Sequence, residues 1–517
     1  MTYFRTLAST TALAGLVAAG AARADVTPEQ AWQGWQQLGA TYGQSLTAQN
    51  QTRSGDTLKV ENIRVHFAQQ GVLVEGLIPE ADFTQRADGK VEITLSPEFP
   101  LEVTVENAPV ADPDAAPDAP PPQPTKTHLE LAIRQPGLVA VASGEGSVSA
   151  VEVTAPSSTV TVTGVDGKSA SELNLVAEAT LSDLSASYRT DGVDARHILS
   201  DFKAAVAEIH VATADPEKNG TFNLRASTTD LKGSSEGKQF SPLGMADMAA
   251  ALRSGASSTG EFTYGPATLE FDFKEAANTL QGSSSAAGGN LTVGLSKDGL
   301  AYGGSTRGLS LTAKGSQIPF PQFNLSFAEA AFDLLIPITR SESPQPFRLL
   351  NRLVDLKVSD EIWALFDPQS QLPRDPATLV VDVGGTATLD VDVFDTAAVD
   401  KLGPAAPGKF NSFDVNELKF TVAGAALTGK GAFTLDNADT VTYGGFPAPT
   451  GKADLRLTGG NGLIDKLVAI GILPQDQAMG ARMMLGMFAR PGDGQDTLTS
   501  TLEFKDKGFF ANGQRLQ

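Results

Sequence analysis

From Thr57 onward, apolar and polar residues alternate along much of the chain. Clear examples are residues 101–105, 151–154, 160–163 and 269–273. Successive side chains of a strand point to opposite faces, so this period of two predicts strands with one buried and one polar face. Strands of that kind form mainly antiparallel sheets. We therefore predict a mainly β (α+β) fold, with long, curved and elongated antiparallel sheets covered on the apolar face by a few amphipathic helices.

The hydrophobic period changes to that of a helix near the start of the chain. In residues 28–46, Trp32 and Trp35 begin an apolar stripe whose members are three or four positions apart. Thr27 can cap this helix, and Gln30 completes a capping box. We predict an amphipathic helix over residues 28–46, with its stripe packed on the body of the protein or presented to a partner.

Further helical patterns occur later in the sequence. They cover residues 241–253, the two segments 347–357 and 359–366, and residues 461–488 with a break at Pro474. Their apolar residues recur at spacings of three and four, which favours helices with one apolar face. We expect the helices of 347–366 and 461–488 to cover part of a sheet.

The pattern also suggests how the chain is divided. A proline-rich segment, residues 108–125, is flanked directly by strand patterns, which favours an extended, disordered hairpin loop within a domain over a boundary between domains. We predict a signal peptide over residues 1–24, an N-terminal β-rich part over 25–340 and a C-terminal β-rich part over 341–517.

The first 24 residues have the features of a secretory signal. Arg5 supplies a positive start, residues 7–19 are apolar and uncharged, and Ala22-Arg23-Ala24 has the small-x-small pattern of a cleavage site. No later apolar run approaches 18 residues, so no transmembrane segment is expected after cleavage. We predict cleavage after Ala24 and location in the periplasm.

Composition narrows the possible functions. The formal net charge is −21, which opposes binding to the phosphates of nucleic acids. The chain has no cysteine, so thiolate catalysis and cysteine-ligated metals are excluded. The string Gly233–Gly237 matches G-x-S-x-G but lacks the apolar strand and following helix that a nucleophile elbow requires. No catalytic residues and no cofactor are predicted.

Two aspartates form the best candidate for a metal site. Asp390 and Asp392 are two positions apart in an alternating run, so they would share the outward face of one strand. Carboxylate oxygens there could bind a hard cation such as calcium. The alternative is a solvated strand face whose charges discourage aggregation.

The methionines after the signal peptide all lie in two predicted helices. The candidate ligand-binding residues are these methionines and one neighbouring phenylalanine: Met245, Met248, Met479, Met483, Met484, Met487 and Phe488. Methionine is flexible and polarizable, so such a cluster can fill an irregular core or form an adaptable apolar surface. We keep both interpretations, a core facing a sheet and a surface that receives an acyl chain or a partner.

Several short strings together resemble one known family. They are residues 24–30, 54–58, 372–379 and 447–451. With the export signal, they are similar to the alphaproteobacterial exported proteins catalogued as domain of unknown function 2125, over nearly the whole mature chain. That family implies no activity and no site residues. Two other C-terminal strings, residues 427–431 and 508–513, resemble more loosely the AsmA-like envelope proteins. That resemblance implies long β-sheets with an apolar groove and a role in lipid traffic.

These observations favour a non-catalytic periplasmic envelope protein. Its role would be to bind an apolar or lipid ligand, or to assemble with envelope partners that the sequence does not identify. The alternative is a periplasmic hydrolase that uses paired carboxylates, and a structure would reveal it as two carboxyl groups converging in a polar cleft.

Overall fold

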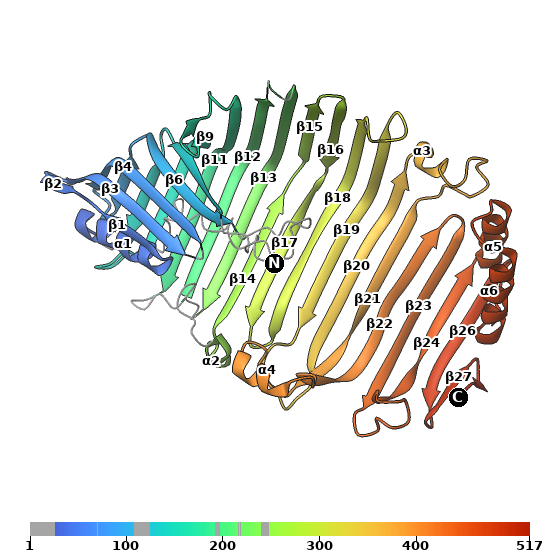
Figure 1. The fold of residues 1–517 in the computed structure, drawn as a ribbon. Coiled ribbons are helices and arrows are strands. Elements are labelled where there is room, and N and C mark those ends of the chain that lie inside the picture. Colours follow the sequence, from blue (N-terminus) through green and yellow to red (C-terminus); the bar gives the residue numbers. More distant parts are fainter. Residues whose placement is uncertain are drawn as a thin grey trace, which may run out of the picture. The chain divides into compact units, whose positions relative to one another are not determined.

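The computed structural model describes residues 26–69, 71–107, 125–191, 197–215, 217, 219–238 and 248–517 (Figure 1). The predicted signal peptide of residues 1–24, almost all of the proline-rich segment and Met245 lie outside the described residues.

The chain divides into two compact units, each described here by itself. Unit 1 comprises Met1–Ala246 and Phe262–Gln281, and unit 2 comprises Asp247–Glu261 and Gly282–Gln517. The predicted division after residue 340 falls inside unit 2. Every described strand register in both units is antiparallel, so the mainly β prediction is confirmed.

Unit 1 begins with one helix and continues as strands. Its elements are α1 (Pro28–Thr41), β1 (Gln44–Thr47), β2 (Asn50–Ser54), β3 (Thr57–Gln69), β4 (Val72–Gln85), β5 (Val91–Leu95), β6 (Glu98–Asn107), β7 (Thr125–Arg134), β8 (Val139–Ser143), β9 (Ala150–Val165), β10 (Lys168–Ser169), β11 (Leu175–Asp191), β12 (His197–Asp215), β13 (Gly220–Lys238) and β15 (Ala267–Glu275). Strands β6 and β7 pair directly from Glu98–Arg134 to Asn107–Thr125, so the proline-rich segment does connect the two strands of a hairpin.

Unit 2 is a series of strands with short helices at its ends. Its elements are α2 (Met248–Arg253), β17 (Gly288–Ser296), β18 (Gly299–Gly315), β19 (Phe323–Ile336), β20 (Gln345–Val358), α3 (Asp360–Trp363), β21 (Ala377–Leu389), α4 (Thr396–Leu402), β22 (Gly408–Val422), β23 (Ala425–Asp436), β24 (Ala448–Thr458), α5 (Gly460–Ala469), α6 (Gln475–Phe488), β25 (Arg490–Pro491), β26 (Thr497–Lys505), β27 (Gly508–Ala511) and β28 (Gln514–Arg515). The chain passes between the units within β14 (Ser257–Tyr264) and β16 (Asn278–Ala286).

The helix α1 closes the core of unit 1. The predicted capping box is present, because Gln30 N–H donates to Thr27 Oγ1 and Thr27 N–H donates to Gln30 Oε1. Trp32 and Trp35 are buried and pack with their rings on Phe83 of β4. These contacts confirm that the tryptophan stripe packs on the body of the unit.

The predicted end of this helix was wrong. The helix stops at Thr41, and the chain turns at Gly43, whose φ is 78°. That left-handed conformation suits glycine, which has no Cβ to clash. Leu46 therefore belongs to strand β1, although it still joins the same core.

In several long strands, the apolar residues switch between even and odd positions part-way along the strand and still lie on one side of the sheet. In β3, the buried residues Leu58 and Val60 occupy even positions, whereas the buried Ile63 and Val65 occupy odd positions. Between them stands Asn62 with a φ of 52°. A left-handed residue re-aims the side chains that follow it. Similar left-handed residues occur within β11, β13, β18 and β20, namely Asp183, Asp230, Gly308 and Asp355.

Two of the helix predictions in unit 2 need correction. Residues 347–357 form strand β20, which pairs with β19 and β21 on its two sides. Its double leucines imitate a helical spacing, but the hydrogen bonds to two neighbours hold it extended. In residues 359–366, only Asp360–Trp363 is α-helical. The prediction of a helical break at Pro474 is confirmed, since α5 ends before it and α6 begins after it.

Candidate functional site

The most distinctive surface of the described chain is one face of the unit 2 sheet. Directly paired residues of neighbouring strands point to the same face. The register therefore places a row of apolar side chains across β20, β21, β22, β23, β24 and β26. Along this row the paired residues are Leu349, Val383, Val415, Gly431, Ala453 and Leu502.

Two further apolar rows flank this one, and each carries large side chains at some positions and glycine at others. On one side the paired residues are Phe347, Gly385, Phe413, Phe433, Gly451 and Phe504. On the other side they are Val381, Leu418, Gly429 and Leu455. At the four central positions, Val383, Val415, Gly431 and Ala453, the side chains are smaller than the phenylalanines and leucines in the flanking rows. We call this apolar strip across the strands, with its two flanking rows, the apolar groove.

Two bulges in β22 keep its apolar residues in the groove. The register shifts by one residue between Val415 and Leu418, and again between Phe410 and Phe413. Each bulge gives β22 one extra residue, so apolar side chains spaced by three positions still point to one face. Phe347 packs edge-on against Phe410, with ring centroids 5.1 Å apart.

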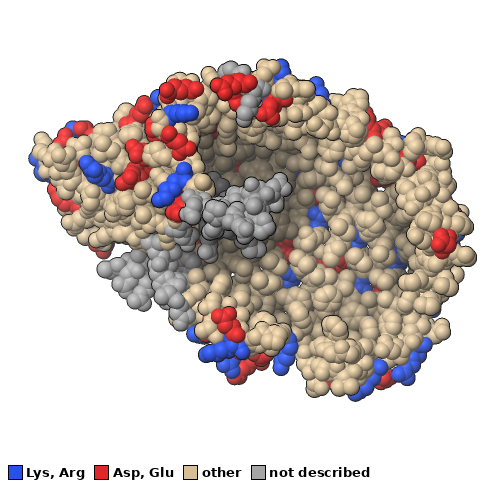
Figure 2. Space-filling model, viewed as in Figure 1, with Lys and Arg blue, Asp and Glu red and all other residues tan. Residues whose placement is uncertain are grey.

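The large side chains of this face are not covered. Six of them retain between 37% and 55% of their surface, and they are Tyr302, Leu349, Leu379, Phe410, Phe413 and Phe420. In the view of Figure 2, the surface over β18 to β24 is hollowed, and uncharged residues make up most of it, with a few Lys, Arg, Asp and Glu side chains scattered among them. Partly exposed apolar residues that form a contiguous patch mark interaction surfaces more often than those scattered singly.

The opposite face of the same strands is charged and internally paired. Arg348 donates to both carboxylate oxygens of Asp382, at 3.2 and 2.8 Å, and to Asp333 at 2.9 Å. Hydrogen bonds from Arg348 and Asn416, together with the nearby arginine charges, outweigh burial and lower the pKa of Asp382. The sheet therefore has an apolar face and a face of ion pairs, and the latter holds β19, β20 and β21 together.

Removing the centre of this ion-pair network should weaken unit 2. We expect Arg348→Ala to lower the free energy of unfolding by about 2 kcal/mol, since bidentate hydrogen bonds to a charged group are lost. The measurement is chemical denaturation followed by circular dichroism. The control is Lys452→Ala, whose partner Asp454 lies 3.4 Å away with both side chains exposed; we expect at most about 0.5 kcal/mol there.

The effect of Arg348→Ala should also depend on pH. Because the pKa of Asp382 is lowered in the folded chain, its contribution is fully present above about pH 4, the ordinary pKa of aspartate, and is lost as the pH falls through the lowered value. The wild type and the variant should therefore converge in acid. If the difference in unfolding free energy between the wild type and the variant stayed constant as the pH fell below the lowered pKa of Asp382, the ion pair would not be the source of the stabilisation.

The structure places four of the predicted methionines on the surface of α6. Met479, Met483, Met484 and Met487 retain 67%, 71%, 57% and 55% of their surface. The core alternative is therefore wrong for these four, and the surface alternative remains a prediction. Phe488, at the end of α6, is half-buried beside Phe509.

The helices α5 and α6 are anchored to the end of the sheet (Figure 1). The Asp496 carboxylate accepts hydrogen bonds from Asn461 N–H, Asn461 Nδ2 and Gly462 N–H at the start of α5. The Phe488 carbonyl, at the end of α6, accepts from Ser500 Oγ and Asn512 Nδ2. Met248 lies elsewhere in the sequence, at the start of α2, and is half-buried.

The predicted cation site at Asp390 and Asp392 is wrong. Strand β21 ends at Leu389, so the two aspartates do not share a strand face. Asp392 is buried, pairs with Arg253 and accepts a hydrogen bond from Arg340 N–H at 2.9 Å. The guanidinium of Arg253 therefore already neutralises the carboxylate of Asp392, which a bound cation would otherwise do. In the described part of the chain, no three carboxylate or imidazole side chains come together to hold a metal ion.

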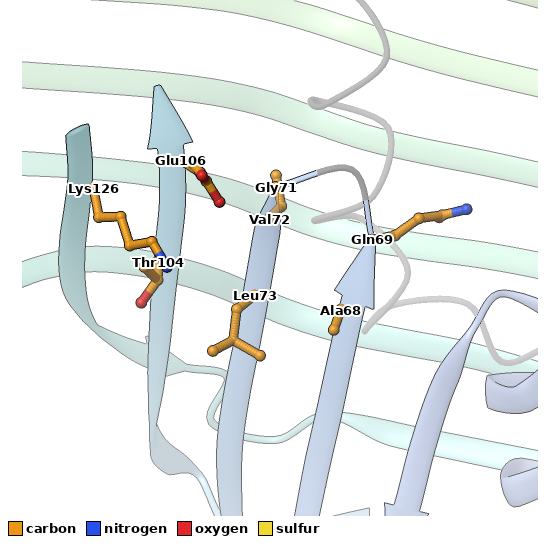
Figure 3. Close-up of a pocket in the computed structure, with 8 residues that line it drawn as sticks. All are labelled: Ala68, Gln69, Gly71, Val72, Leu73, Thr104, Glu106 and Lys126. Atoms are coloured by element: carbon orange, nitrogen blue, oxygen red, sulfur yellow. The ribbon is translucent and has the colours of Figure 1, made fainter. Parts of the chain in front are cut away.

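A shallow cavity in unit 1 provides one place to test the hydrolase alternative. It has a volume of about 400 Å³ and is formed by the ends of β3, β4, β6 and β7 (Figure 3). Its polar lining includes Gln69, Thr104, Glu106 and Lys126, and its one carboxylate is Glu106. Hydrolysis by paired carboxylates needs two such groups facing the substrate, so this cavity does not support it.

Comparisons with known proteins find one family that resembles the C-terminal part of the chain. Residues 260–512 match the family described as "Uncharacterized protein conserved in bacteria (DUF2125)". The family prediction is thereby confirmed for a segment that includes the strings at 372–379 and 447–451, whereas those at 24–30 and 54–58 lie outside the match. No curated protein and no solved structure matches the chain significantly.

The matched segment contains the apolar groove. Every strand that contributes to the groove, from β20 to β26, lies within residues 260–512. No described helix is long and apolar enough to cross a membrane.

Proposed function

We propose that this chain is an exported, non-catalytic protein of the cell envelope that binds the acyl chain of a lipid in the apolar groove. The observation that carries the proposal is the uncharged row of small residues at Val383, Val415, Gly431 and Ala453, flanked by rows that contain exposed phenylalanines and leucines. A hydrocarbon chain needs an elongated, uncharged surface, and this face provides one.

The length of the groove suits a long acyl chain. Its central row crosses six strands, and neighbouring strands are about 4.8 Å apart, so it extends for about 24 Å. Covering a half-exposed side chain such as Leu349 or Phe413 would contribute roughly 1 kcal/mol, from the apolar surface removed from water. Several such contacts along one chain would give measurable affinity without any charged contact.

The sequence supports the cellular setting of this proposal. Residues 1–24 have the features of a signal peptide that directs the chain to the periplasm. The resemblance to AsmA-like envelope proteins agrees with a groove that holds lipid. A strongly acidic chain would repel anionic headgroups. We therefore expect the protein to recognise the hydrocarbon part of the lipid and not its headgroup.

The experiment is to purify the chain from a periplasmic extract without detergent and to analyse it by native mass spectrometry. We expect a bound species of lipid mass that organic solvent releases, and uptake of a fluorescent fatty acid by the stripped protein. Lipid-free protein that also fails to take up the fatty acid would refute the proposal.

A further inference from the structure

The exposed methionines of α6 form a cluster whose chemistry differs from that of the apolar groove. Four of the seven methionines in the chain fall within nine residues, at positions 479, 483, 484 and 487. All four side chains are more than half exposed. Leucine would supply a similar apolar area and is also a strong helix former, whereas methionine adds a soft sulfur ligand, so the cluster is also a candidate metal site.

The helix brings these sulfur atoms within reach of one another. Residues three and four positions apart lie next to each other on a helix, with Cβ atoms about 5–6 Å apart. Met487 is four positions from Met483 and three from Met484, and Met479 lies one turn earlier. Each methionine has three rotatable bonds, so the thioethers can turn toward a common point.

The surroundings of the cluster leave room for an ion. Gly480 and Gly486 lie among the methionines, and a Cβ added at either position would meet no atom within 4 Å. The charge nearest in sequence, Arg482, is paired with Asp465 of α5 at 2.5 Å. The hydrogen bonds of Asp496 and of the Phe488 carbonyl fix the two ends of the helix pair.

We propose that the methionine cluster of α6 is a binding site for monovalent copper. Thioethers are soft ligands that select Cu(I), whereas hard cations and zinc prefer oxygen, nitrogen or thiolate. Met483, Met484 and Met487 each donate a sulfur lone pair to the ion, and Met479 is the fourth candidate ligand. The ion enters and leaves as Cu(I), so no electron is transferred. This site is independent of the acyl chain proposed for the groove.

The test is titration of the purified full-length protein with Cu(I), under anaerobic conditions with ascorbate and a competing chromophoric chelator. We expect about one Cu(I) per chain, and no uptake of Zn(II) by this cluster. The decisive variant replaces Met479, Met483, Met484 and Met487 with leucine, which keeps the apolar surface and helix propensity but removes every sulfur. It should lose Cu(I) uptake while keeping its circular dichroism spectrum and its uptake of fatty acid.

A matched control is Met248→Leu, which removes a methionine outside the cluster and should leave Cu(I) uptake unchanged. Retention of Cu(I) by the fourfold leucine variant, or no uptake by the wild type, would overturn the proposal. Loss of fatty-acid uptake together with Cu(I) uptake in this variant would overturn the independence of the two sites, because the groove residues are untouched.

Discussion

Val415→Asp is expected to reduce fatty-acid uptake by tenfold or more. Val415 lies at the middle of the groove, paired with Val383 on one side and Gly431 on the other. A carboxylate there would have to lose its hydration when a hydrocarbon chain lies over it, and burying an unpaired charge costs far more than the roughly 1.4 kcal/mol that corresponds to a tenfold change in affinity. The measurement is titration with a fluorescent fatty acid.

The control for this prediction introduces the same charge on the other face of the sheet. Ala432 follows Gly431 on β23, so its side chain points away from the groove, and it is exposed. Ala432→Asp should bind the fatty acid as the wild type does. Equal loss of uptake in both variants would indicate a general effect of added charge, and no loss in Val415→Asp would exclude the groove as the binding surface.

Phe83→Ala is expected to lower the stability of unit 1 by about 3–5 kcal/mol, the usual cost of removing a buried phenylalanine ring. Phe83 is fully buried on β4, and its ring contacts those of Trp32 and Trp35 at centroid distances of 6.0 and 6.2 Å. Its removal would leave a cavity under α1, so the helix would lose its main contact with the sheet. Denaturation monitored by tryptophan fluorescence would detect the change.

A phenylalanine on the surface of the same unit provides the control. Phe262 is 37% exposed and lies beside Tyr264. Phe262→Ala should cost at most about 1 kcal/mol, since little buried surface is lost. If the two variants were equally stable, the assignment of Trp32, Trp35 and Phe83 to one core would be wrong.

Local patterns were sufficient for much of the fold. Alternation predicted long antiparallel strands because one buried face imposes a period of two on the sequence. The capping box at Thr27 and the tryptophan stripe predicted α1, since both depend on residues within a few positions of each other. The hairpin across the proline-rich segment could be predicted because strand patterns reach it from both sides.

Features that depend on distant strands could not be predicted. The helical spacing of Leu349, Leu350 and Leu353 suggested a helix, but pairing with both β19 and β21 makes this segment a strand. The groove itself depends on register across six strands. In β22, one bulge puts Phe413, Val415 and Leu418 on one face, although their spacing of two and then three residues fits no single period.

The candidate sites show the same limit. The alternation through Asp390 and Asp392 suggested a shared strand face, but the strand ends before them, and Asp392 forms an ion pair with Arg253. The methionine cluster could be recognised from its spacing alone. Whether it faced the core or the solvent depended on how α5 and α6 attach to the sheet, through the Asp496 carboxylate at the start of α5 and the Phe488 carbonyl at the end of α6.

The most direct test of the lipid groove is photocross-linking with a fatty acid that carries a diazirine along its hydrocarbon chain, followed by mapping of the labelled peptides. If the acyl chain lies across the strands, label should appear on β20 to β24, at groove residues such as Leu349, Val383 and Val415, and excess unlabelled fatty acid should displace it. Label confined to α6, to the cavity of unit 1 or to the charged face of the sheet would contradict the assignment of this groove as a lipid site.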